Sequence, residues 1–277
     1  MPQPQMPGRL ARWVLVTVAA ASVLWQSTPV ASGQASPYKA PRTADGRPNL
    51  NGIWQAITEA SWDIEPHAAA QGPAPALGAA GAIPPGLGIV EGGRLPYLPG
   101  AAEQKRKNFE NRIALDPEVK CYLPGTPRAM YMPYPFQVIQ TPKYIMMVFT
   151  FARAVRTIYM DDHMEAPADS WMGWSNGRWD GETLVVDTAG FNGMTWFDRA
   201  GNFHSEALRV TERFTASSPN HLLYEATLED PKTFSRPWKI SLPLYRRLEP
   251  NAQLLEFRCV EFAEDIIYGH LKKQPSQ

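Results

Sequence analysis

The chain has 277 residues, and its 27 lysines and arginines balance its 27 aspartates and glutamates. With that balance, and without a basic stripe along the sequence that could neutralise phosphates, a nucleic acid is a poor candidate for a partner. The 27 prolines predict abundant loops and argue against long helices.

The N-terminal residues 1–35 have the pattern of a secretory signal peptide. Arg9 and Arg12 precede an apolar stretch at residues 13–25, and small residues follow at positions 31, 32, 33 and 35. The apolar stretch is shorter than the roughly 20 residues that a bilayer-spanning helix needs. We therefore expect cleavage near residue 35, no membrane span afterwards, and a periplasmic or secreted mature protein.

Residues 36–120 are predicted to form an N-terminal segment of the same domain as the rest of the chain. A polar, turn-rich stretch leads into a short strand at residues 52–57, which contains Trp54. Residues 67–99 are rich in alanine, glycine and proline, which favours a flexible loop or a wrap. Residues 101–114 form the one predicted helix, on the surface because few of its positions are apolar.

Residues 121–277 are predicted to form the body of the domain, from short strands separated by glycine, proline, asparagine and aspartate. Asp180-Gly181 between two of these strands is a strong hairpin signal. With the strand at Trp54, the order is that of an antiparallel meander, which predicts a lipocalin-like barrel or a strongly curved sheet. Gly52-x-Trp54 is similar to the first-strand signature of lipocalin-like barrels. The predicted strands are 136–141, 144–151, 155–161, 171–179, 183–188, 208–214, 222–228, 238–248 and 254–262.

Two glutamates fall on apolar faces of predicted strands. Alternation places Glu212 with Leu208, Val210 and Phe214, and it places Glu261 with the apolar positions of residues 254–262. An inward carboxylate requires a partner or a raised pKa. Each glutamate is therefore either a functional group or one half of a buried ion pair with an arginine such as Arg128 or Arg156.

Cys121 and Cys259 are the only cysteines. Two thiols in an exported chain form a disulfide more often than a metal or catalytic site, so we predict a Cys121–Cys259 bridge. That bridge would join the beginning of the strand region to its last strand.

Several polar residues could support catalysis. Residues 173–177 (GWSNG) match the nucleophile elbow of serine hydrolases, and Asp187 or Asp198 and then His204 follow downstream as possible partners of Ser175. The elbow requires a helix after the serine, however, and a strand is predicted here. A tight turn is therefore the alternative.

An acid–base set is the second possibility. His163 or His204 could act as acid or base, with Asp161 orienting the ring and Glu212 as a second carboxylate. The alternative for each histidine is a surface or capping role. His204 and Glu206 with a further histidine could bind a metal, but their spacing is ordinary, and we predict neither a metal nor a cofactor.

Aromatic residues gather between positions 171 and 197. Trp171, Trp174, Trp196 and Phe197, together with Glu261, are expected to line a site for a flat, partly apolar small molecule. Core packing is the alternative for most of these tryptophans.

The chain also resembles a known family through four motifs. These are residues 45–54 (DGRPNLNGIW), 121–128 (CxxPGxPR), 173–186 (GxSxGxWDGETLVV) and 204–206 (HSE). The family is a large group of uncharacterised exported proteins from environmental bacteria, and the resemblance spans nearly the whole mature chain. It implies one exported domain and assigns no catalytic residue. Residues 161–165 (DDHME) depart from the Asp-Gly-Arg-x-His-Pro that related chains often carry.

Taken together, these features predict an exported enzyme that acts on a small, partly apolar organic molecule by acid–base chemistry, of the lyase, isomerase or hydratase type. A non-catalytic, lipocalin-like binding protein of the periplasm is the alternative. A structural or interaction protein of the cell envelope is a third possibility.

Overall fold

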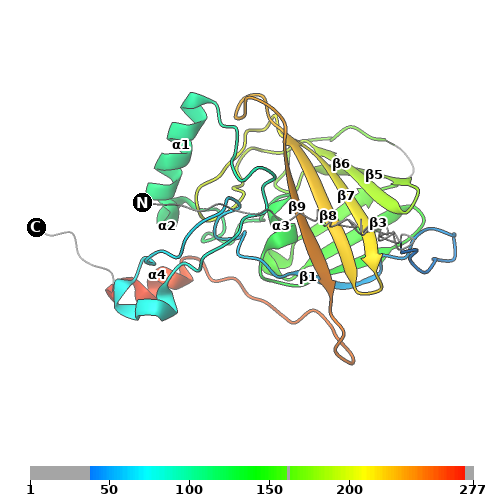
Figure 1. Ribbon diagram of the computed structural model, residues 1–277, viewed down its shortest axis with the longest axis horizontal. Helices are drawn as coiled ribbons and strands as arrows, with labels where there is room; N and C mark the ends of the chain where they lie inside the picture. The colour runs from blue at the N-terminus through cyan, green and yellow to red at the C-terminus, as the bar shows by residue number, and fades with distance from the viewer. Residues whose placement is uncertain (1–37, 161–162, 272–277) are drawn as a thin grey trace, which may run out of the picture. The chain divides into compact units, whose positions relative to one another are not determined.

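Nine strands form the framework of the structure, a computed structural model that describes residues 38–160 and 163–271. They close into a barrel in chain order, in which each strand pairs with the next and β9 pairs with β1 (Figure 1). The mainly β, barrel-forming fold predicted from the sequence is confirmed. The predicted signal peptide lies outside the described residues. The strands are β1 (Gly52–Ala56), β2 (Phe136–Gln140), β3 (Tyr144–Phe149), β4 (Val155–Tyr159), β5 (Trp174–Asp180), β6 (Thr183–Ala189), β7 (Arg209–Ser218), β8 (His221–Glu229) and β9 (Trp238–Arg246).

One pair of neighbouring strands departs from the antiparallel meander. β4 and β5 run parallel and pair at only two positions, Ile158 with Ser175 and Tyr159 with Asn176. A tight turn would make the two strands antiparallel, whereas the long connection at residues 160–173 allows a parallel pair. By contrast, the hairpin predicted at Asp180-Gly181 is confirmed, since β5 and β6 pair up to Asp180 and Thr183.

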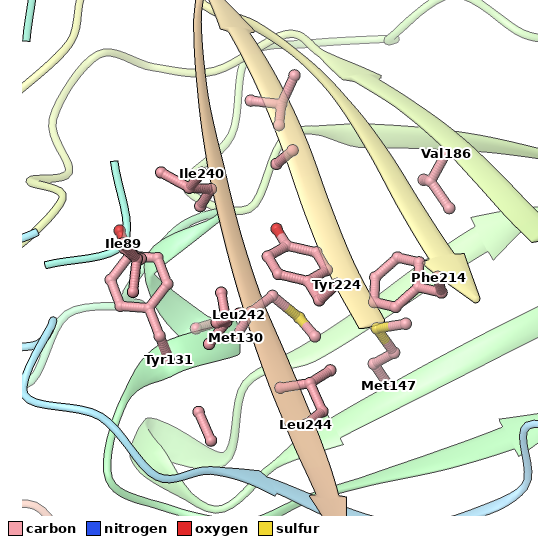
Figure 2. Close-up of a cluster of buried hydrophobic side chains, with 14 of the residues drawn as sticks. Ile89, Met130, Tyr131, Met147, Val186, Phe214, Tyr224, Ile240, Leu242 and Leu244 are labelled. Carbon is pink, nitrogen blue, oxygen red and sulfur yellow. The ribbon is translucent and has the colours of Figure 1, made fainter. Parts of the chain in front are cut away.

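Alternate residues of the strands point into the barrel and form the core. Val186, Phe214, Tyr224 and Leu242 come from four different strands and lie in one cluster (Figure 2). The predicted inward face of β7 is confirmed, because Val210, Glu212 and Phe214 are all buried. The short helix α3 (Arg128–Tyr131) adds Met130 and Tyr131 to the same cluster.

Segments outside the strands cover parts of the barrel. The predicted helix at residues 101–114 is present as α1 (Pro99–Glu110) and α2 (Arg112–Leu115), which are separated at Asn111. The alanine-, glycine- and proline-rich segment wraps against the barrel, since Val90 bridges to Ile240 and Tyr97 bridges to Phe234. The remaining elements are the helix α4 (Ala263–Tyr268) and the 3-10 turns η1 (Pro75–Gly81), η2 (Phe151–Arg153) and η3 (Gly269–Leu271).

The strand predicted at residues 254–262 is wrong. This segment has no strand pairing, Leu255 is 73% exposed, and Glu261 is exposed rather than inward. A closed barrel leaves no free edge with which another strand could pair. The predicted disulfide between Cys121 and Cys259 is confirmed, and it therefore joins the end of the N-terminal segment to an irregular segment instead of a last strand.

Candidate functional site

His204 lies in the core with both of its ring nitrogens already bonded. Nδ1 donates to the carbonyl oxygen of Ser205 at 2.8 Å, so in the neutral ring Nε2 accepts from the hydroxyl of Thr195 at 2.5 Å. Phe191 and Phe197 pack against the ring, and burial lowers the pKa of His204. This environment suits a neutral structural histidine.

Glu212 lies inside the barrel in a bidentate ion pair with Arg156. Arg156 Nη1 donates to Glu212 Oε1 at 3.0 Å, and Nη2 donates to Oε2. The same guanidinium donates to Ser175 and Thr188, and the hydroxyl of Tyr224 donates to Glu212 at 2.8 Å. Of the two alternatives stated for this glutamate, the structure shows the buried ion pair with an arginine.

Ser175 belongs to that network and not to a nucleophile elbow. It lies within β5, is buried, and is 3.1 Å from the hydroxyl of Thr188. The tight turn proposed as the alternative is also wrong, because residues 174–177 lie in β5 and pair with β6, and Gly173 directly precedes the strand.

Asp198 is buried in the loop that precedes β7. Its carboxylate accepts hydrogen bonds from the backbone of Ile64 and Ala200 and from the side-chain amide of Asn202. Burial, with a further contribution from the charge of Asp63, raises the pKa of Asp198 to about 7. Because these contacts tie residues 64, 198 and 202 together, Asp198 fastens the loop to the N-terminal segment.

His163 is exposed and lines a groove on the outer face of the barrel, which we call the outer groove. The groove has a volume of about 640 Å³, and neither His204 nor Glu212 lines it. Asp161, predicted to orient a histidine, lies outside the described residues. The structure therefore does not bring His163, His204 and Glu212 together in one pocket. The outer groove is lined by residues of the segment 163–166 and of β5 to β8, among them Trp174, Asn176, Asp187, Arg209, Thr211 and Glu229.

The residues expected to contact a ligand are dispersed in the same way. Trp174 lines the outer groove. Trp171 packs on Tyr122 with ring centroids 4.9 Å apart, and Trp196 is partly buried. Phe197 is 1% exposed and packs against Trp238 in the core, which corrects the expectation that it lies over a ligand. Glu261 is an exposed residue just before α4.

A second concavity, which the sequence did not predict, lies beside the disulfide. It has a volume of about 300 Å³ and contains Cys259 in its wall; we call it the disulfide cleft. Tyr134, Phe151 and Phe257 form an aromatic cluster along it, with centroid separations of 4.9 to 5.8 Å. A neighbouring hollow of about 240 Å³ is also lined by Ile113 and so extends the cleft. Other apolar residues of the disulfide cleft are Pro73, Ile83, Val119, Val260, Phe262 and Ala263.

A chain of ion pairs forms the polar end of the disulfide cleft. Arg128 bonds Asp116 at 2.9 Å and Glu118 at 2.5 Å, and Arg199 bonds the other oxygen of Glu118 at 2.7 Å. Burial alone would raise the pKa of Glu118, but the two guanidinium groups outweigh it and hold that pKa below its ordinary value. The guanidinium of Arg199 also stacks on Trp62, with Cζ 4.6 Å from the centroid of the ring. These groups neutralise one another and fix the shape of the cleft.

Arg112 is the exception among the charged residues of the cleft. Its guanidinium is partly buried, donates to the carbonyl oxygen of Phe109 at 2.9 Å, and lies 4.2 Å from the centroid of that ring. Within residues 38–160 and 163–271 it forms no ion pair with a carboxylate, and burial lowers the pKa of Arg112. It therefore offers unused hydrogen-bond donors and a positive charge to the cleft.

A metal-binding cluster and a membrane-spanning helix are both absent from residues 38–160 and 163–271. In the part of the chain that the structure describes, no group of three histidine, cysteine, aspartate or glutamate residues is placed to hold a metal ion. No described helix combines the length and the apolar character needed to cross a bilayer.

Comparison with protein-family models and with curated proteins finds no match to this chain. The resemblance to the family of exported bacterial proteins stays a prediction.

Proposed function

We propose that this protein is a binding protein for a small organic anion with a mainly apolar body, and that the ligand occupies the disulfide cleft. The observation that carries the proposal is Arg112, a partly buried guanidinium without an acidic partner among the described residues, in a cleft that combines apolar and aromatic walls with an end of paired charges. Small-molecule sites typically combine apolar and aromatic walls with a few polar groups that orient the ligand.

The charges of the cleft favour an anion over a cation or a neutral molecule. Asp116, Glu118 and Glu264 are already paired with Arg128 and Arg199, so they do not repel a carboxylate strongly, and Asp265 is one further acidic residue of the wall. A partly desolvated guanidinium without a counterion is unfavourable, and an anionic ligand would relieve this cost while forming charge-assisted hydrogen bonds. The aromatic cluster of Tyr134, Phe151 and Phe257 would contact the apolar body.

The site of action that we propose is outside the cytoplasm. The Cys121–Cys259 bridge supports it, because disulfides persist in oxidising compartments such as the periplasm. The disulfide also holds one wall of the cleft, so the ligand site would depend on that environment.

The acid–base enzyme predicted from the sequence stays a second hypothesis, since His163 remains accessible in the outer groove. Conversion of a bound compound by the wild type and not by His163→Ala would favour it over simple binding.

A matched pair of probes tests the proposed function. We would titrate the purified protein with 4-phenylbutanoate and with 4-phenylbutan-1-ol, following heat release by calorimetry. The carboxylate should bind about tenfold tighter than the alcohol, which corresponds to about 1.4 kcal/mol. This difference is close to the lower end of the range for a hydrogen bond to a charged group, about 1.5 kcal/mol. Arg112→Gln should abolish this difference.

Arg106→Gln is the control, because Arg106 lies on the exposed side of the neighbouring helix, in ion pairs with Glu103 and Glu110. It should keep the preference for the carboxylate. The proposal is wrong if neither probe binds, or if Arg112→Gln and Arg106→Gln behave alike.

A further inference from the structure

The outer groove is the concavity that the proposed function does not use. It lies over the outward faces of β5, β6, β7 and β8, and the segment at residues 163–166 forms its wall. That segment is fixed to β5 by Asn176, whose side chain accepts from the backbone nitrogen of Met164 at 3.1 Å and donates to the carbonyl oxygen of Met164 at 2.9 Å. The wall is therefore held in place in the absence of any ligand.

An aromatic platform lies at one side of the groove. Trp174 stacks on Tyr159 with ring centroids 4.4 Å apart and an interplanar angle of 12°, and Tyr144 meets the edge of Tyr159. The indole nitrogen of Trp174 is shielded from solvent and has no hydrogen-bond partner among the described residues. A ligand in the groove would therefore contact the ring of Trp174, which lines the groove, and not this nitrogen.

The floor of the groove presents unpaired groups of both signs. Arg209 on β7 and Glu229 on β8 lie directly opposite each other in register on the outer face. Opposite charges in such positions commonly form a cross-strand pair, yet no ion pair joins these two in the described structure, and both side chains are exposed. Asp187, in contrast, is paired with Arg178 and accepts from Thr211 at 2.7 Å.

This combination selects against most ligand classes. An apolar molecule would leave the charged floor without partners. An organic anion would approach Glu165 and Glu229, whereas an organic cation would approach Arg209. A neutral polyhydroxylated molecule suits these groups, because each hydroxyl both donates to a carboxylate and accepts from a guanidinium. The apolar face of a sugar ring also matches the flat surface of a tryptophan.

The geometry points to the outer groove as a binding site for neutral carbohydrate, with the sugar ring on Trp174 and its hydroxyls shared between Arg209 and Glu229. This site is separate from the disulfide cleft, and its occupant differs from the organic anion proposed there.

Titration with neutral trisaccharides tests the inference. The full-length protein would be titrated with maltotriose, cellotriose and mannotriose, and binding followed by tryptophan fluorescence and calorimetry. At least one trisaccharide should bind with a dissociation constant of about 1 mM or below. Trp174→Ala should weaken that binding about tenfold or more, since it removes the stacking surface.

Three further variants separate the possible outcomes. Glu229→Gln keeps the shape of the floor and should also weaken trisaccharide binding, whereas Arg112→Gln in the disulfide cleft should leave it unchanged. His221→Gln, on β8 but outside the groove lining, is the matched surface control. The inference is overturned if none of the three trisaccharides binds at concentrations up to about 10 mM, which is tenfold above the expected dissociation constant. It is also overturned if Trp174→Ala binds the trisaccharide as tightly as the wild type does.

Discussion

Removal of the interior guanidinium is the sharpest test of how the barrel is stabilised. In Arg156→Met, Glu212 loses its bidentate partner and keeps only the hydroxyl of Tyr224, at a position that is 0% exposed. Removing one partner of a buried ion pair costs about 3–5 kcal/mol. With an m-value of about 2 kcal/mol/M, the urea midpoint should fall by about 1.5–2.5 M, measured by circular dichroism and fluorescence in parallel.

The double variant Arg156→Met with Glu212→Leu distinguishes the cost of leaving the Glu212 charge unpaired from the cost of lost packing. It removes both charges and should recover most of the stability, with a remaining cost of about 1–3 kcal/mol because the hydroxyl of Tyr224 loses its acceptor. Arg213→Met, which breaks the exposed pair with Asp180, is the control and should cost less than about 1 kcal/mol. A single variant as stable as this control, or a double variant less stable than the single one, would refute the reasoning.

Two further predictions concern the disulfide and the buried histidine. Replacing Cys121 and Cys259 with serine removes a bridge that spans 138 residues. On the chain-entropy model the free energy of unfolding should therefore fall by up to about 5 kcal/mol, and 4-phenylbutanoate binding should weaken as well. An unchanged urea midpoint would contradict this prediction. Burial lowers the pKa of His204 in the folded protein. As the pH falls, the histidine of the unfolded chain is therefore protonated before that of the folded protein. The stability that neutral His204 contributes is complete above about pH 6.5 and is lost as the pH falls below this value. His204→Gln should flatten the dependence of the unfolding free energy on pH between about 5 and 7, and an unchanged slope would show that another group is responsible.

The strands could be predicted from the sequence because their signals are local. Alternation of apolar residues places Val210, Glu212 and Phe214 on one face, and Asp180-Gly181 marks a turn, without any knowledge of distant residues. The same alternation misled at residues 254–262. Whether an alternating segment becomes a strand depends on a free sheet edge, and the pairing of β9 with β1 removes that edge.

The candidate site was harder to predict because it depends on contacts between distant parts of the chain. His204 and Glu212 were chosen for their chemistry, but only the structure shows that Thr195 and Arg156 already occupy their polar atoms. The disulfide cleft combines residues near positions 73, 113, 134, 151 and 257. The one sequence signal for it was the predicted bridge, which placed the surroundings of Cys121 and Cys259 side by side.

The two-residue pairing of β4 with β5 has a consequence for how the barrel fluctuates. Few backbone hydrogen bonds hold this junction, so it should open locally at a lower free energy than the long pairing of β7 with β8. Arg156 extends from β4 across the junction to Ser175, Thr188 and Glu212, and its side chain thereby supplies bonds that the backbone lacks there. Backbone amides at this junction should then exchange with solvent faster when that side chain is removed, so the interior ion pair influences how often the barrel wall parts.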